Sequence, residues 1–230
     1  MTSFADRLAA VRARIADACR LAGRDPREIG IVAVSKTQPA AAVVAAIAAG
    51  VEAIGENRVQ EAISKRPGVP AGPPWHLIGP LQRNKARQAL DTFDLIETVD
   101  RSEIADRIEA LLATTSRVVP VFLEINVGGE EQKSGVTPAQ APLLVDHIVA
   151  ACPHLALTGV MTVPPYHPDP ERSRPVFAAL YMLADDLARR AGVARFELSM
   201  GMSEDFPVAV QEGATLVRLG RVLFGERDHA

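Results

Sequence analysis

The sequence predicts an α/β protein built as a single (β/α)8 barrel of the TIM type, with one extra helix at its N-terminus. Eight short runs rich in β-branched residues alternate with helical stretches along the chain. Most of these runs are apolar throughout, which is typical of parallel strands covered by helices on both faces. The length of 230 residues also suits one barrel of eight such units.

The extra helix is expected over residues 3–22, because its apolar residues recur every three or four positions. The first strand follows at residues 31–35. A helix then runs from Pro39 to Ala49, with proline at an early helical position and Gly50 just past the end. Residues 66–74 (RPGVPAGPP) read as a loop, because proline and glycine disfavour regular structure.

The later elements repeat this alternation. Further strands are expected at residues 53–55, 75–78, 95–99, 118–127, 155–161, 196–200 and 215–219. Helices are expected at residues 58–65, 82–90, 101–113, 138–151, 170–191, 204–212 and 222–225. Thr137 and Pro138 are predicted to be the N-cap and first residue of their helix, and Ser203 to be an N-cap as well.

An open, doubly wound sheet is the structural alternative to the barrel. Neither GxGxxG after a strand nor GxxxxGK[ST] occurs, so both phosphate-loop fingerprints of open sheets are missing. No linker or shift in composition divides the chain, so residues 1–230 are expected to form one domain. A closed barrel has no free sheet edge, and a monomer is therefore expected.

Composition excludes several classes of function. A net charge of −3 and few aromatic residues (seven Phe, two Tyr, one Trp) disfavour binding to nucleic acid. No apolar run is long enough to span a membrane, and the charged first twenty residues are unlike a secretory signal, so a cytoplasmic protein is expected. Cys19 and Cys152 indicate no disulfide framework, and the five histidines show no metal-binding spacing, so no metal site is expected.

In such a barrel the functional groups lie at the carboxyl ends of the strands. Lys36 follows the apolar run IVAVS, where desolvation would lower the pKa of its amine and make it nucleophilic towards aldehydes. The alternative is a lysine that extends into solvent. Ser203, Gly220 and Arg221 stand in the loops after strands seven and eight, where barrels often bind phosphate.

Arg218 lies within the eighth strand and needs a partner if it points inward. A buried ion pair with a carboxylate is one reading, and a contact to a ligand ring is the other. A lysine that traps an aldehyde, a phosphate cradle and an arginine directed at a ring together suggest pyridoxal 5'-phosphate (PLP).

Six segments in order along the chain carry a resemblance: AVSKTQP (33–39), GENRVQE (55–61), WHLIGPLQRNK (75–85), GVMTVPP (159–165), LSMGMSEDF (198–206) and VRLGRVLFGER (217–227). They resemble the YggS/PROSC family of PLP-binding homeostasis proteins, whose fold is similar to the barrel domain of alanine racemase. The resemblance implies a carrier that buffers PLP and passes it to PLP-dependent apoenzymes by transient contact.

The resemblance also implies residue roles. Lys36 would hold PLP covalently as a Schiff base, and Asn57 would lie beside it. Ser203, Gly220 and Arg221 match phosphate-binding positions, and Arg218 matches the arginine that faces the pyridine nitrogen. The chain departs from the family at two positions, since Arg58 replaces a common tyrosine and Arg221 a frequent threonine or serine.

Two enzymatic functions are alternatives to the carrier. A racemase of the alanine racemase type needs a second base, and Tyr166 and Tyr181 are expected in the loop after strand six and on an outer helix, so that neither is placed as that base. A Schiff-base aldolase would leave Arg218 and the phosphate loop unexplained. We therefore expect no catalytic residue. Lys133, in the glycine-rich loop after strand five, is expected to be solvated, with a second PLP-accepting amine as its alternative.

Overall fold

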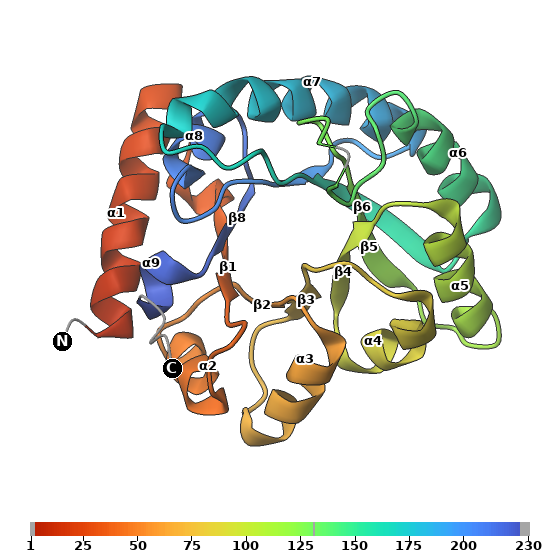
Figure 1. Ribbon diagram of the computed structural model, residues 1–230, viewed down its shortest axis with the longest axis horizontal. Helices are drawn as coiled ribbons and strands as arrows, with labels where there is room; N and C mark the ends of the chain where they lie inside the picture. Colours follow the sequence, from red (N-terminus) through yellow and green to blue (C-terminus); the bar gives the residue numbers. More distant parts are fainter. Residues whose placement is uncertain (1–2, 131, 226–230) are drawn as a thin grey trace.

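The computed structural model describes residues 3–130 and 132–225, in which eight parallel strands alternate with helices (Figure 1). The strands are β1 (Gly30–Val34), β2 (Ala53–Glu56), β3 (Trp75–Leu77), β4 (Leu95–Val99), β5 (Val119–Glu124), β6 (Leu155–Met161), β7 (Glu197–Ser199) and β8 (Leu216–Leu219). They close into a barrel in sequence order. Because β1 pairs with both β2 and β8, the open sheet is excluded and the predicted barrel is confirmed.

Helices surround the strands on the outside of the ring (Figure 1). They are α1 (Phe4–Ala22), α2 (Ala40–Ala48), α3 (Val59–Lys65), α4 (Ala86–Thr92), α5 (Ser102–Leu112), α6 (Ala141–Ala151), α7 (Arg174–Arg190), α8 (Phe206–Gln211) and α9 (Arg221–Phe224). Short 3-10 turns are Pro26–Glu28, Arg66–Gly68, Arg83–Lys85 and Pro170–Ser173. The turn Arg66–Gly68 lies at the start of the predicted loop 66–74, and the turn Arg83–Lys85 lies at the start of the helix predicted at 82–90. No helix in the described part of the chain is long and apolar enough to cross a bilayer.

The extra helix α1 lies outside the junction of the first and last strands, beside α8 and α9 (Figure 1). It begins with a capping box, in which the Ser3 hydroxyl accepts from the Asp6 amide and the Asp6 carboxylate accepts from the Ser3 amide. It ends at Gly23, whose φ of 66° suits glycine. The face carrying Leu8, Val11 and Ile15 is buried. The helix therefore covers the seam where the barrel closes.

The predicted cap of the sixth helix is wrong. The helix α6 begins at Ala141 with Gln140 as its N-cap, three residues after the predicted Pro138. The hydroxyl of Thr137 donates to the Gln140 side chain, while the amides of Gln140 and Ala141 bond to the Thr137 carbonyl. Thr137 thus closes a turn before the helix and caps no backbone amide.

Three of the strands carry a buried glutamate. Glu56 in β2, Glu97 in β4 and Glu124 in β5 are all buried, among strands that are otherwise apolar. Burying a carboxylate is costly unless it has a partner, so each of these side chains needs one. Glu56 and Glu124 are the last residues of their strands, at the end of the barrel where function is expected, and Glu97 is in the middle of β4.

Candidate functional site

A cavity of about 380 Å³ opens at the carboxyl end of the barrel. Its lining includes the six candidate residues named from the sequence, which are Lys36, Asn57, Ser203, Arg218, Gly220 and Arg221. They come from the ends of β1, β2 and β8 and from the turn before α8. The barrel closure brings β1 and β8 side by side, and so places the turn after Lys36 next to the turn at Gly220.

Lys36 is half-buried and follows the last buried residues of β1. The next residue, Thr37, has a φ of 67°, a left-handed conformation that costs a β-branched residue about 1–3 kcal/mol. The amide of Thr37 donates to the Glu61 carboxylate on α3, which holds this turn. The backbone at the lysine is therefore kept in one strained conformation.

A buried lysine, Lys65, contacts the backbone at the same end of β1. The Lys65 amine donates to the Ser35 carbonyl oxygen at 2.6 Å and to the Glu56 and Glu61 carboxylates at 2.6 and 2.7 Å. The Ser35 hydroxyl donates to the same Glu56 oxygen at 2.6 Å. Burial raises the pKa of Glu56 despite these partners. Lys65 thus fixes the residue directly before Lys36, a role that sequence reasoning missed.

Arg218 lies inside the barrel and is buried. Its guanidinium donates to the Ser199 carbonyl and hydroxyl oxygens at 2.6 and 2.8 Å and to the Thr162 carbonyl oxygen at 2.8 Å. Burial lowers the pKa of this guanidinium, which still stays protonated at neutral pH. Among the described residues no carboxylate pairs directly with Arg218, so the predicted alternative of a buried ion pair is wrong.

A relay through Ser199 connects Arg218 to a carboxylate instead. The Ser199 hydroxyl donates to one Glu97 oxygen at 2.5 Å, and the ring nitrogen Nδ1 of His76 lies 2.7 Å from the other. His76, on β3, is therefore a hydrogen-bonded histidine of the core. The chain of contacts fixes the guanidinium beneath the cavity without neutralising it directly.

Glu124, the last residue of β5, is another buried carboxyl group. Its side chain is buried, and its Oε2 atom has no hydrogen-bond partner among the described residues. Burial, and to a lesser extent Asp100, raise its pKa to about 7 against the opposing effect of Arg218. Glu124 therefore exchanges a proton near neutral pH within the electrostatic reach of Arg218.

Ser203 does not cap α8, contrary to the prediction. That helix begins at Phe206 after Asp205, and the Ser203 hydroxyl instead accepts from the Val222 amide in α9 at 3.3 Å. Ser203 therefore lies at the first turn of α9, beside Gly220. The guanidinium of Arg221 pairs with Glu204 at 2.8 Å, which turns its charge towards the protein surface.

Asn57 is held close to the neighbouring strand end. A Cβ atom at Gly79 would lie 2.3 Å from the Asn57 carbonyl oxygen, so only glycine permits this approach. Arg58, which stands beside it in the sequence, is exposed and lies outside the cavity lining.

Tyr166 and His167 line the rim of the cavity, and Tyr166 lies in the loop after β6, as predicted. Tyr166 is 77% exposed.

Lys133 contacts the same loop, since its amine donates to the Pro164 carbonyl oxygen at 3.0 Å and pairs with Glu130. Lys133 is thus half-buried and connects two loops, and the prediction of a solvated side chain is wrong. Tyr181 lies on α7, as predicted.

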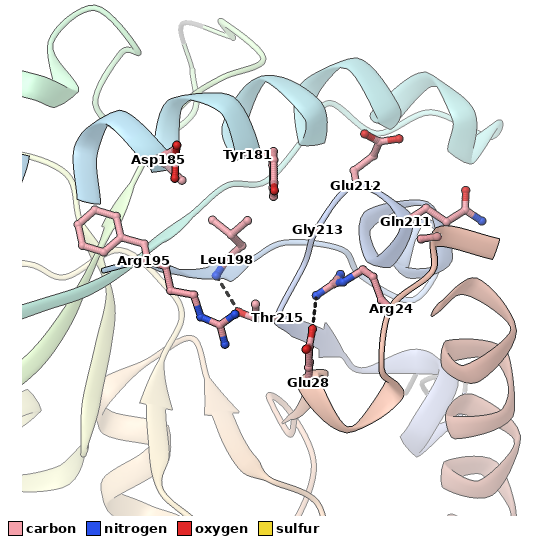
Figure 2. A pocket seen from close by; sticks show the side chains of 13 residues that line it. Arg24, Glu28, Tyr181, Asp185, Arg195, Leu198, Gln211, Glu212, Gly213 and Thr215 are labelled. Carbon is pink, nitrogen blue, oxygen red and sulfur yellow. Dashed lines mark hydrogen bonds and ion pairs between the residues drawn. The ribbon is translucent and has the colours of Figure 1, made fainter. Parts of the chain in front are cut away.

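A second cavity, of about 560 Å³, lies at the opposite end of the barrel (Figure 2). Its polar side chains contact the protein itself: Arg24 donates to the Val210 and Ala214 carbonyl oxygens, and Thr215 accepts from the Leu198 amide. Arg195 is exposed at its edge, and no lysine lines it. The larger cavity therefore lacks a lysine amine and a buried arginine such as those that line the smaller cavity.

Comparisons with known proteins agree with this geometry. The family described as "Alanine racemase, N-terminal domain" matches residues 7–228. A pyridoxal phosphate homeostasis protein of Pseudomonas aeruginosa is 43% identical over all of this chain and 98% of its own length, and one of Aquifex aeolicus is 41% identical over 97% and 98%. The solved structure of PipY from Synechococcus elongatus with PLP bound is 35% identical, covers 97% of this chain and all of its own, and has a TM-score of 0.84.

Proposed function

The chain belongs to the pyridoxal phosphate homeostasis proteins of the alanine racemase N-terminal domain family, and we propose that Lys36 holds PLP without turning over a substrate. The protein binds PLP and acts in the homeostasis of this cofactor. The single observation that supports the site is the convergence of Lys36, Arg218 and Ser203 on one cavity at the carboxyl end.

The residues present fit this cofactor. Lys36 supplies an amine for its aldehyde, and the turn of Ser203, Gly220 and Arg221 supplies a hydroxyl and backbone amides for its phosphate. The bonds from Arg218 to Ser199 and Thr162 leave its Nε–H without an acceptor among the described residues. That donor suits an unprotonated ring nitrogen. Asn57 completes the lining on the side of β2.

The proposed absence of turnover rests on Arg218. Bound PLP offers an aldehyde to amines and a ring that withdraws electrons well only when its nitrogen is protonated. Arg218 holds its own proton and cannot give it to that nitrogen. The chain therefore holds the ring in its weakly withdrawing form. A PLP-dependent racemase is the alternative function, and Tyr166 at the rim is the residue that would supply its second base.

The first experiment locates the cofactor. Protein purified with PLP is reduced with borohydride, digested and mapped by mass spectrometry, and the adduct is expected on Lys36. The Lys133→Ala variant is the matched control and should keep the adduct. An adduct on Lys133 alone would contradict the assignment.

The second experiment tests turnover. Saturated protein is incubated with L-alanine in heavy water, and the exchange of the α-proton is followed while transfer of PLP to an apoenzyme is timed. We expect transfer without appreciable exchange. Exchange at about 1 s⁻¹ or faster lies in the enzymatic range and would overturn the carrier proposal. Loss of such exchange in Tyr166→Phe would then identify a racemase.

We propose in addition that residues 1–230 form one domain, that the protein is a monomer of the cytoplasm, and that it meets apoenzymes only transiently and binds no nucleic acid. The closed barrel, which leaves no unpaired strand edge among the described residues, supports the monomer. Limited proteolysis and light scattering test the domain and the monomer.

A further inference from the structure

A cluster of three different metal-ligating side chains lies on the outside of the barrel, between α5 and α6. Asp106 comes from α5, His147 from α6, and Cys152 is the residue at which α6 ends. The helices α5 and α6 are neighbours in the ring (Figure 1), and neither contributes a residue to the cavity that Lys36 lines. None of the three residues has a part in the proposed binding of PLP.

The ligand atoms are close enough to share one ion. His147 Nε2 lies 2.6 Å from Asp106 Oδ1, Cys152 Sγ lies 4.0 Å from the same oxygen, and the three atoms all lie within 4.8 Å of one another. In a tetrahedral zinc site with bonds of about 2.0–2.3 Å, neighbouring ligand atoms are roughly 3.3–3.7 Å apart. Small side-chain rotations that lengthen the first separation and shorten the others would reach that geometry.

The surroundings differ for the three ligands. Cys152 is buried, whereas the His147 and Asp106 side chains are 34% and 54% exposed, so the site is anchored on the protein side and open to water on the other. Glu109, one turn after Asp106, adds a second negative charge near the sulfur and is itself bonded to His154. Burial and these two carboxylates raise the pKa of the Cys152 thiol to about 11.

We propose that Asp106, His147 and Cys152 bind a divalent ion of the zinc class, with water in the fourth position. The mixed set of oxygen, nitrogen and sulfur ligands suits Zn²⁺, whereas Mg²⁺ and Ca²⁺ prefer oxygen alone. Binding forms a metal–sulfur bond and releases the thiol proton to solvent, with no change in oxidation state. The sequence has no HxH or HxxxH motif that would indicate this site, because its ligands come from two helices.

The test uses the full chain without a histidine tag, titrated with Co²⁺ as a spectroscopic probe. We expect a thiolate-to-cobalt charge-transfer band in the near ultraviolet and the visible bands of tetrahedral cobalt, both bleached when Zn²⁺ displaces it. Cys19→Ser is the matched control, because Cys19 is the other buried free cysteine and is not part of the cluster. The bands should persist in Cys19→Ser and disappear in Cys152→Ser.

Two surface variants keep the test decisive if Cys152→Ser fails to fold. His147→Ala and Asp106→Asn should each weaken Zn²⁺ binding more than about tenfold, since even outer-sphere partners of a metal are worth that much. The proposal is overturned if the parent protein gives no charge-transfer band. It is also overturned if the band survives Cys152→Ser, or if neither surface variant changes the affinity.

Discussion

The two ends of the barrel hold their charges in opposite ways. At the carboxyl end, Arg218 is buried at a cavity of about 380 Å³, and Glu56 and Glu124 are buried as the last residues of their strands. At the amino end, the larger cavity of about 560 Å³ is lined by exposed groups such as Arg195 and Asp185 (Figure 2). Buried charges cost stability unless they are partnered, so a fold keeps them where they serve a purpose. Here buried charge, and not cavity size, distinguishes the candidate site.

Removing one partner of a buried ion pair should give the largest effect at the carboxyl end. Lys65→Met leaves the fully buried Glu56 without its main partner, and we expect a loss of about 3–5 kcal/mol in the free energy of unfolding. Urea denaturation at pH 7 measures this loss. The double variant Lys65→Met, Glu56→Gln removes both charges and should recover much of the stability. A single variant as stable as the parent would show that the charges of this end cost little.

Glu124 should make stability depend on pH. Folding raises its pKa from 4.5 to about 7, so the folded state binds the additional proton between these values. The contribution of Glu124 is fully present below about pH 4.5 and is lost as the pH rises through about 7, an effect of roughly 3 kcal/mol. Glu124→Gln cannot titrate and should escape this loss.

The measurement compares urea denaturation of parent and Glu124→Gln at pH 5 and pH 8. The variant should gain on the parent at the higher pH. Equal pH profiles for the two proteins would show that Glu124 titrates at its ordinary value in the folded state.

Ser203→Ala should weaken PLP binding by roughly ten- to a hundredfold, because it removes one charge-assisted hydrogen bond worth about 1.5–3 kcal/mol. Pyridoxal, which lacks the phosphate, serves as the matched ligand and should lose much less. Fluorescence titration with both ligands measures the difference. Equal losses would place Ser203 away from the phosphate.

The smallest effect is expected at the amino end. Arg195→Ala removes an exposed side chain from the larger cavity and should change the free energy of unfolding by no more than about 0.5 kcal/mol. Its PLP affinity should equal that of the parent. A tenfold drop in affinity would mean that the two ends are coupled.

The barrel and six of the cavity residues could be predicted from the sequence, because strands and the positions just after them follow a local pattern. Apolar runs mark the strands, and side chains just after them, such as Lys36 and Asn57, reach the carboxyl end of any such barrel. Caps were less predictable. Ser203 and Thr137 have the side chains of N-caps, but Ser203 bonds across to α9 and Thr137 bonds to a neighbouring side chain.

The supporting contacts depend on which strands face each other across the barrel. Ser199 and Glu97 are joined by a hydrogen bond between residues 102 positions apart, and no local pattern reports that. A hint was present, since a glutamate within an apolar strand such as LIETV must find a partner when it is buried. That hint identifies Glu97 but not its partner.

The pairing of β1 with β8 has a consequence for the order of events during synthesis. Lys36 leaves the ribosome early with β1, whereas Gly220 and Arg221 emerge only after the last strand. The pocket thus comes into existence when the ring closes, and an incomplete chain has no place for a ligand. A molecule that contacts both turns joins the first and last strands across their seam. It binds only the finished barrel, and by mass action it stabilises the closed ring against opening.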